Sequence, residues 1–135
     1  MDKKILIIDD EAPIADLIAE FCNTMGYSTQ VLNSGKDILN VIKSFHPDLI
    51  TLDLAMPDIP GTKVLAILRK DEQARHIPVL IISSTIGSLR EEPISGDLAP
   101  PEGVMPKPIR MEGLRKKIDT VLHAHDKERE QSPKQ

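Results

Sequence analysis

Four short runs in this chain of 135 residues end beside side chains that can carry polar chemistry. Asp9 and Asp10 follow "KILII", Asp53 follows "LITL", Ser83 closes "VLIIS" and Lys107 follows "GVMP". A carboxylate next to buried apolar surface is costly to desolvate unless something compensates its charge. Carboxylates that meet a lysine and a hydroxyl could hold a divalent cation together with a phosphoryl group, because such cations prefer oxygen ligands and phosphate oxygens accept from both donors.

The segments that must position these side chains alternate between two periodicities. Short runs, mostly rich in Ile, Leu and Val, predict strands over residues 4–9, 28–32, 49–53, 79–83 and 103–106. Apolar residues with helical spacing predict four helices between and after them, with buried faces formed by Ile14, Leu17, Ile18, Phe21 and Met25, by Ile38, Val41, Ile42 and Phe45, by Val64, Leu65 and Leu68, and by Leu114, Ile118, Val121 and Leu122.

Local signals mark where the first two helices begin and end. Pro13 suits the first turn of the first helix, and Gly26 suits the C′ position that follows its last turn. Ser34, with Asp37 three residues later, forms a capping-box pattern ahead of the second helix.

Strands joined by helices imply right-handed crossovers and a parallel sheet that is covered on both faces. We therefore predict an α/β fold with a doubly wound, five-stranded parallel sheet in the flavodoxin-like order 2-1-3-4-5. The region of the fourth helix, within residues 88–103, is expected to be irregular, because it contains the helix breakers Pro93, Gly96, Pro100 and Pro101. The domain is predicted to span residues 1–125, and residues 126–135, which lack apolar side chains, to form a charged, disordered tail.

In this strand order, the chemistry-bearing residues converge on one place. Ligands of open α/β sheets bind beyond the carboxyl ends of the strands, where the strand order reverses, which is here between the first and third strands. Asp9, Asp10 and Asp53 are therefore expected to meet there. Clustered carboxylates repel one another unless a cation compensates, and oxygen ligands of this kind suit Mg²⁺.

Asp53 could then act as a nucleophile that accepts a phosphoryl group, since aspartates form acyl phosphates in known enzymes. Lys107 could neutralise one phosphoryl oxygen and the Ser83 hydroxyl could donate to another. Each residue alone has an ordinary interpretation, such as capping of the first helix by Asp9 and Asp10. Their joint position at four strand ends favours a site.

These residues resemble the receiver domains of bacterial two-component response regulators. The resemblance covers residues 3–123 and includes Asp53 with Met56-Pro57 and Gly61 behind it. It implies that a sensor histidine kinase or a phosphotransfer protein phosphorylates Asp53 and that Mg²⁺ is required. By the same resemblance, Asp10, Asp53 and the Ala55 carbonyl would ligate the metal, with Asp9 supporting it through water. Ser83 would hydrogen-bond the phosphoryl group, and Lys107 would pair with it.

Two departures concern how the signal leaves the site. The family often carries an aromatic ring three residues before the lysine, and Val104 stands there, so a ring switch cannot operate. The irregular region within residues 88–103 replaces a helix that often belongs to the output surface. The alternative function is a receiver-like protein-binding module that works without phosphorylation, although the five filled site positions argue against it.

Composition excludes several other classes. The net charge is −4 and only three aromatic residues are present, so direct nucleic-acid binding is not expected. Cys22 is single and is predicted to be a buried, reduced thiol. No apolar run approaches the length of a membrane span, and a cytoplasmic location without membrane contact is predicted. Phosphate-binding glycine motifs are absent, and we expect no enzyme beyond phosphoryl transfer to, and hydrolysis from, Asp53; the downstream partner is unknown.

Overall fold

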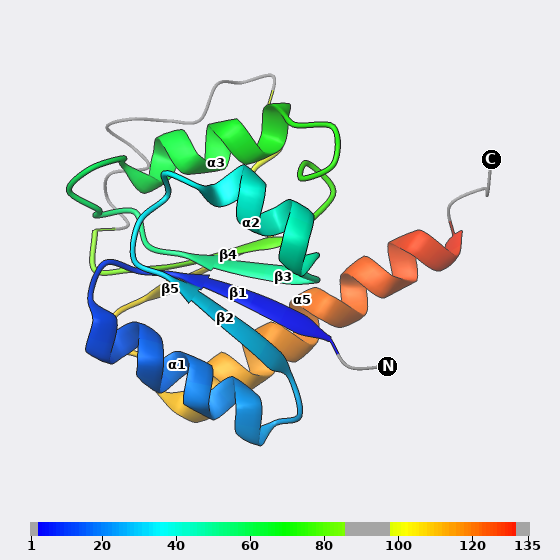
Figure 1. The fold of residues 1–135 in the computed structure, drawn as a ribbon. Coiled ribbons are helices and arrows are strands. Elements are labelled where there is room, and N and C mark those ends of the chain that lie inside the picture. The colour runs from blue at the N-terminus through cyan, green and yellow to red at the C-terminus, as the bar shows by residue number, and fades with distance from the viewer. Residues whose placement is uncertain (1–2, 86–97, 132–135) are drawn as a thin grey trace.

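The computed structural model describes residues 3–85 and 98–131, with side chains described up to residue 127 (Figure 1). Its strands are β1 (Lys4–Ile8), β2 (Ser28–Leu32), β3 (Leu49–Leu52), β4 (Val79–Ser83) and β5 (Gly103–Pro106). Its helices are α1 (Ala12–Thr24), α2 (Ile38–Phe45), α3 (Gly61–Lys70) and α5 (Met111–Gln131). All five predicted strands and the four predicted helices are therefore present in the described part of the chain.

The five strands form one parallel sheet in the order β2-β1-β3-β4-β5. This order confirms the doubly wound architecture. Because β1 lies between β2 and β3, the chain moves to one side of β1 first and then to the other. The strand order thus reverses between β1 and β3, and the residues that follow these two strands come together at the same edge of the sheet.

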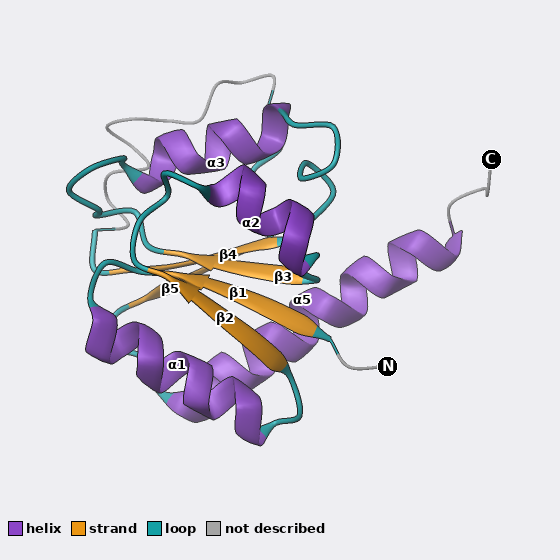
Figure 2. Ribbon diagram, viewed as in Figure 1, coloured by secondary structure: helices purple, strands orange, loops and turns teal. Residues whose placement is uncertain are grey.

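Two apolar clusters, one on each face, hold the sheet between its helices (Figure 2). Helices α2 and α3 cover one face, where Ile42, Leu65 and Leu68 pack with side chains of the strands. Helices α1 and α5 cover the other face through Ile18 and Ile118. Burial on both faces explains why β3 and β4 are apolar at nearly every position.

Helix α1 begins and ends as its sequence predicts. Pro13 lies in its first turn, where the missing N–H has no intrahelical partner to lose. Gly26 follows the C-terminal end with φ of +95°, a conformation that favours glycine. The buried Cys22 thiol of this helix has a pKa raised to about 12 by burial, so it is a neutral packing group.

The capping box expected before α2 is wrong. The N-cap of α2 is Asp37, and its side chain makes no capping hydrogen bond. The Ser34 hydroxyl donates instead to the Asp58 carboxylate, which lies in the loop after β3, and it accepts the N–H of Lys36. A tertiary partner has therefore replaced the local one, and this contact joins the loops that follow β2 and β3.

The segment before β5 is irregular, as predicted, in its described part, residues 98–102. Residues 86–97, where most of the expected irregular region falls, lie outside the described residues. A buried arginine of α3 holds the described part in place. Arg69 donates to the carbonyls of Ala99 and Pro100 at 3.2 and 3.1 Å, and to both carboxylate oxygens of Glu102 at 2.9 and 2.7 Å.

Arg69 also binds the turn that follows its own helix. Its Nη1 donates to the carbonyls of Arg75 and Ile77 at 3.2 and 3.0 Å. The Glu102 carboxylate in turn accepts the N–H of Val79, the first residue of β4. One guanidinium thus joins α3, the turn before β4 and the segment before β5.

Helix α5 continues to Gln131, beyond the predicted domain limit at residue 125. Residues 126–131 were expected to belong to a disordered tail, and in the structure they are helical. Two physical reasons favour this outcome: Lys, Glu, Arg and Gln are good helix formers, and the packed part of α5 supplies the nucleus that such a segment lacks alone. Lys3 pairs with Asp126 at 3.0 Å and fastens the extension beside the start of β1. Among the described residues, we find no helix with the length and apolarity needed to cross a membrane.

Replacing Arg69 by alanine is expected to lower the free energy of unfolding by about 3 kcal/mol, because buried carbonyls and a carboxylate would lose a shared charged donor. Urea denaturation followed by circular dichroism measures this change. Arg115→Ala is the control, since Arg115 pairs with Glu112 on an exposed face of α5 and should leave the midpoint nearly unchanged. Equal effects of the two substitutions would contradict the anchoring role of Arg69.

Candidate functional site

The sheet itself places two of the candidate acids. The N–H of Asp53 donates to the carbonyl of Ile8 at 2.9 Å, and the N–H of Asp9 donates to the carbonyl of Leu32 at 3.0 Å. Each hydrogen bond extends the interstrand pairing one residue beyond the strand end. Both side chains are almost fully buried, with 2% of Asp9 and 3% of Asp53 exposed. The backbone positions of these carboxylates are therefore set by the rigid part of the fold.

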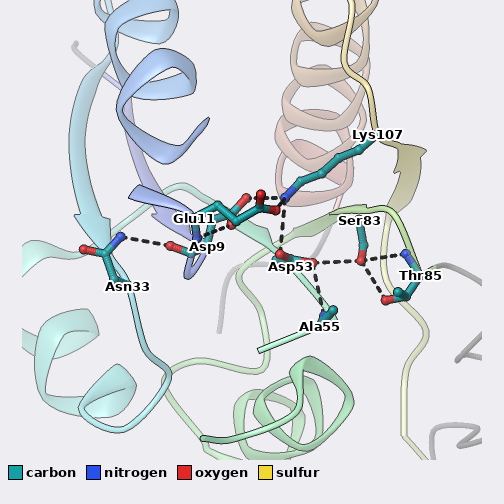
Figure 3. A network of polar contacts seen from close by, with 8 residues as sticks. All are labelled: Asp9, Glu11, Asn33, Asp53, Ala55, Ser83, Thr85 and Lys107. Atoms are coloured by element: carbon teal, nitrogen blue, oxygen red, sulfur yellow. Dashed lines mark hydrogen bonds and ion pairs between the residues drawn. The ribbon is translucent and has the colours of Figure 1, made fainter. Parts of the chain in front are cut away.

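Lys107 is the cation of the site (Figure 3). Its Nζ lies 2.8 Å from Oδ2 of Asp9, 3.0 Å from Oε1 of Glu11 and 3.3 Å from Oδ2 of Asp53. The N–H of Lys107 donates to the carbonyl of Ser83, which fixes the chain at the end of β5. Burial alone would lower the pKa of Lys107, but the hydrogen bonds to Asp9 and Glu11 and the charge of Asp53 outweigh burial and raise that pKa.

Asp9 illustrates the cost of placing acids here. Burial raises the pKa of its carboxyl group, although the hydrogen bonds from Lys107 and from the Glu11 N–H oppose the shift. A carboxyl group whose pKa is raised on folding makes the folded state less stable when it is ionised. The contact with Lys107 therefore offsets only part of the cost of burying the Asp9 carboxylate.

The carboxylate of Asp53 is held by three donors. Oδ1 accepts the N–H of Ala55 at 3.1 Å and the hydroxyl of Ser83 at 2.8 Å, while Oδ2 faces Lys107. The Ser83 oxygen also accepts the N–H of Thr85 at 3.2 Å and lies 3.1 Å from the Thr85 hydroxyl. A hydroxyl, an ammonium and a backbone N–H thus converge on one carboxylate.

Asp10 completes a group of acids that could hold a metal ion. Carboxylate oxygens of Asp9, Asp10 and Asp53 lie within 4.8 Å of one another. Oδ1 of Asp10 is buried, yet it accepts no hydrogen bond from the described residues. A buried acceptor without a donor is costly, and a cation would satisfy it. Oxygen donors alone suit Mg²⁺, so the residues present fit this metal.

The capping interpretation of the first two acids receives little support. The N-cap of α1 is Glu11, and its side chain makes no capping hydrogen bond. Asp9 accepts the N–H of Glu11 through Oδ1, but its other oxygen faces Lys107, and Asp10 makes no such contact among the described residues. Capping therefore accounts for at most one oxygen of Asp9 and for none of the described contacts of Asp10.

Gly61 explains why the chain can turn so tightly behind Asp53. A Cβ atom at this position would lie 2.3 Å from the carbonyl oxygen of Asp53 and 2.5 Å from Cα of Leu54. The N–H of Gly61 donates to the carbonyl of Leu54 at 2.9 Å. Only glycine permits the start of α3 to pack directly against the backbone that carries Asp53.

Five predicted site residues therefore lie in one network or beside it, namely Asp9, Asp10, Asp53, Ser83 and Lys107. The described hydrogen bonds place the N–H of Ala55 at Asp53, and the role of the Ala55 carbonyl stays a prediction. Sequence reasoning assigned no role to Glu11, Thr85 or Asn33, whose amide donates to the carbonyl of Asp9. Glu11 directly follows Asp10 and Thr85 lies two residues after Ser83, which was a signal for both, whereas Asn33 is brought to the site by its place directly after β2.

Comparison with known families agrees with this arrangement. The model of the response regulator receiver domain family matches residues 5–119. The chain belongs to this family. It is a receiver domain of the type found in the response regulators of two-component systems, and a signalling domain rather than a classical metabolic enzyme.

Relatives of known name share this domain. The polar-differentiation response regulator DivK of Brucella ovis is 33% identical over 84 residues, which are 62% of this receiver domain chain and 68% of DivK. The DNA-binding dual master transcriptional regulator RpaA of Synechocystis is 32% identical over 124 residues, which are 92% of this chain and 51% of RpaA. The chain thus spans about half the length of RpaA.

Solved structures show the same receiver fold. A CheY-like response regulator receiver domain protein from Methanospirillum hungatei has a TM-score of 0.79 at 23% identity, covering 95% of this chain and 99% of that one. The response regulator protein TrrA from Thermotoga maritima, in complex with Mg²⁺-BeF, has a TM-score of 0.75 at 25% identity, covering 88% of this chain and 98% of that one.

Replacing Asp10 by asparagine is expected to raise the metal-free free energy of unfolding by about 1 kcal/mol, because it removes one of three repelling charges. In the unsubstituted protein, Mg²⁺ at one hundred times its dissociation constant should add about 2.7 kcal/mol, and in Asp10→Asn this gain should disappear. Chemical denaturation with and without Mg²⁺ measures both effects.

Asp16→Asn on the exposed side of α1 provides the control for a simple change in net charge. It should retain the stabilisation by Mg²⁺. If Asp10→Asn proved clearly less stable without metal, Asp10 would act mainly as a helix-capping residue and the metal assignment would fail.

Proposed function

We propose that this receiver domain accepts a phosphoryl group on Asp53 in a reaction that requires Mg²⁺. The observation that carries the proposal is the convergence on one buried carboxylate of the Ser83 hydroxyl and the Lys107 ammonium, with Asp9 and Asp10 beside it. The Mg²⁺-BeF complex of TrrA supports the chemistry, since the two chains share a fold.

The donor is proposed to be a phosphohistidine of a sensor histidine kinase or of a phosphotransfer protein. A carboxylate oxygen of Asp53 forms the new bond to phosphorus while the bond from phosphorus to the imidazole nitrogen breaks, and the imidazole departs with that electron pair. The carboxylate is oriented before the reaction, because the Ala55 N–H and the Ser83 hydroxyl hold Oδ1. Orientation of this kind lowers the entropic part of the barrier.

Two residues around Asp53 can stabilise the negative charge of an incoming phosphoryl group. The ammonium of Lys107 can move from Asp53 to a phosphoryl oxygen, because a flexible side chain links it to the backbone after β5. The Ser83 hydroxyl can donate to a second oxygen, and its link to Thr85 passes this change to the loop after β4.

The metal is proposed to be held by Asp10, Asp53 and the Ala55 carbonyl, with Asp9 supporting it through water. When bound, Mg²⁺ would neutralise charge on the carboxylates and on the phosphoryl oxygens. This assignment explains why the buried Oδ1 of Asp10 has no hydrogen-bond partner among the described residues.

Hydrolysis is the proposed return step. Water attacks the phosphorus of phosphorylated Asp53, and the bond from phosphorus to the carboxylate oxygen breaks, which restores Asp53 and releases phosphate. The domain therefore resets itself, and no independent substrate is turned over.

The output is proposed to pass to a downstream protein in the cytoplasm rather than directly to nucleic acid. RpaA is a DNA-binding regulator by name, but the chain matches about half of it, and a net charge of −4 with three aromatic residues does not favour a basic, aromatic surface. The alternative of a phosphorylation-independent binding module is less favoured, because such a module has no need for the complete constellation of acids, hydroxyl and lysine.

Incubation with acetyl phosphate and Mg²⁺ is expected to add one phosphoryl group to Asp53, as located by mass spectrometry of the intact protein and of its peptides. Asp53→Asn and the addition of EDTA should each abolish the adduct. Asp58→Asn is the matched control, since Asp58 is an exposed acid in the loop that follows Asp53. An adduct that persists in Asp53→Asn would show a different phosphoacceptor.

A further inference from the structure

Glu11 contacts Lys107 but has no role in the phosphoryl transfer proposed above. It stands at the N-cap of α1, directly after the two acids of the metal group, and its side chain reaches back to Lys107 at 3.0 Å (Figure 3). About half of this side chain, 52%, is exposed. The contact is therefore built into the site but can open toward solvent.

The three acidic partners of Lys107 differ in whether they could also bind a metal ion. Asp9 and Asp53 belong to the group of oxygens that could hold a metal, whereas Glu11 does not. Binding of a cation would draw the first two carboxylates toward it. Glu11 would then remain as the acid that competes for the ammonium.

The distances show on which side Lys107 is held. Its ammonium lies closer to Asp9 and Glu11, at 2.8 and 3.0 Å, than to Asp53, at 3.3 Å. A phosphoryl group on Asp53 needs this ammonium on the Asp53 side. The contact with Glu11 must therefore weaken for Lys107 to serve the phosphoryl group.

We propose that Glu11 is a positioning residue that competes with the phosphoryl group for Lys107 and so limits how readily the activated state forms. The inference rests on the proposed function, since it concerns the partner that Lys107 takes up on phosphorylation. Glu11 stabilises the unphosphorylated state through its ion pair and adds negative charge near the arriving group. Both effects act in the same direction.

The ion pair between Glu11 and Lys107 can be removed without breaking the hydrogen bonds that hold the start of α1. The hydrogen bond that Glu11 makes to Asp9 comes from its backbone N–H, and the side chain makes no capping hydrogen bond to α1. Glu11→Gln therefore removes the charge at constant length. Glu11→Asp keeps the charge but shortens the side chain by one methylene, which is expected to draw the carboxylate away from Lys107.

The test uses beryllium fluoride with saturating Mg²⁺ as a phosphoryl analogue, with binding followed by the amide shifts of labelled protein. We expect Glu11→Gln and Glu11→Asp each to lower the apparent dissociation constant by about two- to five-fold, the range set by an exposed ion pair. Phosphorylated Glu11→Gln should also lose its phosphoryl group more slowly. Glu20→Gln, an exposed acid on the far part of α1, should match the unsubstituted protein.

Each outcome decides the matter. Weaker binding in Glu11→Gln, or binding equal to that of the unsubstituted protein, would overturn the competing role. A tighter Glu11→Gln beside an unchanged Glu11→Asp would also overturn it, because charge alone would then account for the effect. If the unsubstituted protein bound no beryllium fluoride and took no phosphoryl group, the proposed function would fail first.

Discussion

The site depends on the interaction of one lysine with several carboxylates that the fold has taken out of water. Lys107 contacts Asp9 and Asp53, which are both almost fully buried, and only 8% of the Lys107 side chain is exposed. A buried ion pair is weak evidence for stability, because desolvation offsets much of the attraction. What the lysine provides is partial compensation for the charge of the three neighbouring acids.

That balance requires rigid placement, and the sheet supplies it. The acids Asp9 and Asp10 follow β1 and Asp53 follows β3, while the Ser83 hydroxyl belongs to β4 and Lys107 follows β5, so neighbouring strands position the five predicted site residues. Two apolar clusters fix these strands from both faces. Because the groups are attached to backbone that is already hydrogen bonded, they have little freedom to separate and relieve their repulsion.

Patterns with one strong physical cause were predictable from sequence. Apolar periodicity located every described strand and helix, and the reversal of strand order then placed Asp9, Asp10, Asp53, Ser83 and Lys107 together. Features that depend on a distant partner were not predictable. Ser34 resembled a capping residue but binds Asp58, and the helical extension to Gln131 has a partner in Lys3. Arg69 gave no signal, since its acceptors are mostly backbone carbonyls of remote segments.

Arg69 affects the candidate site at the opposite end of the sheet, because it helps to fix the register of the edge strand β5, which precedes Lys107. Strand β5 has only four residues, and its N-terminal end is tied to Val79 by Glu102, which Arg69 holds. Side chains alternate along a strand, so sliding β5 by one residue would exchange its two faces. Lys107 would then leave the acids and Val104 would leave the apolar cluster. The buried Arg69 therefore helps to set the register of β5 and, with it, the position of Lys107 beside the acids.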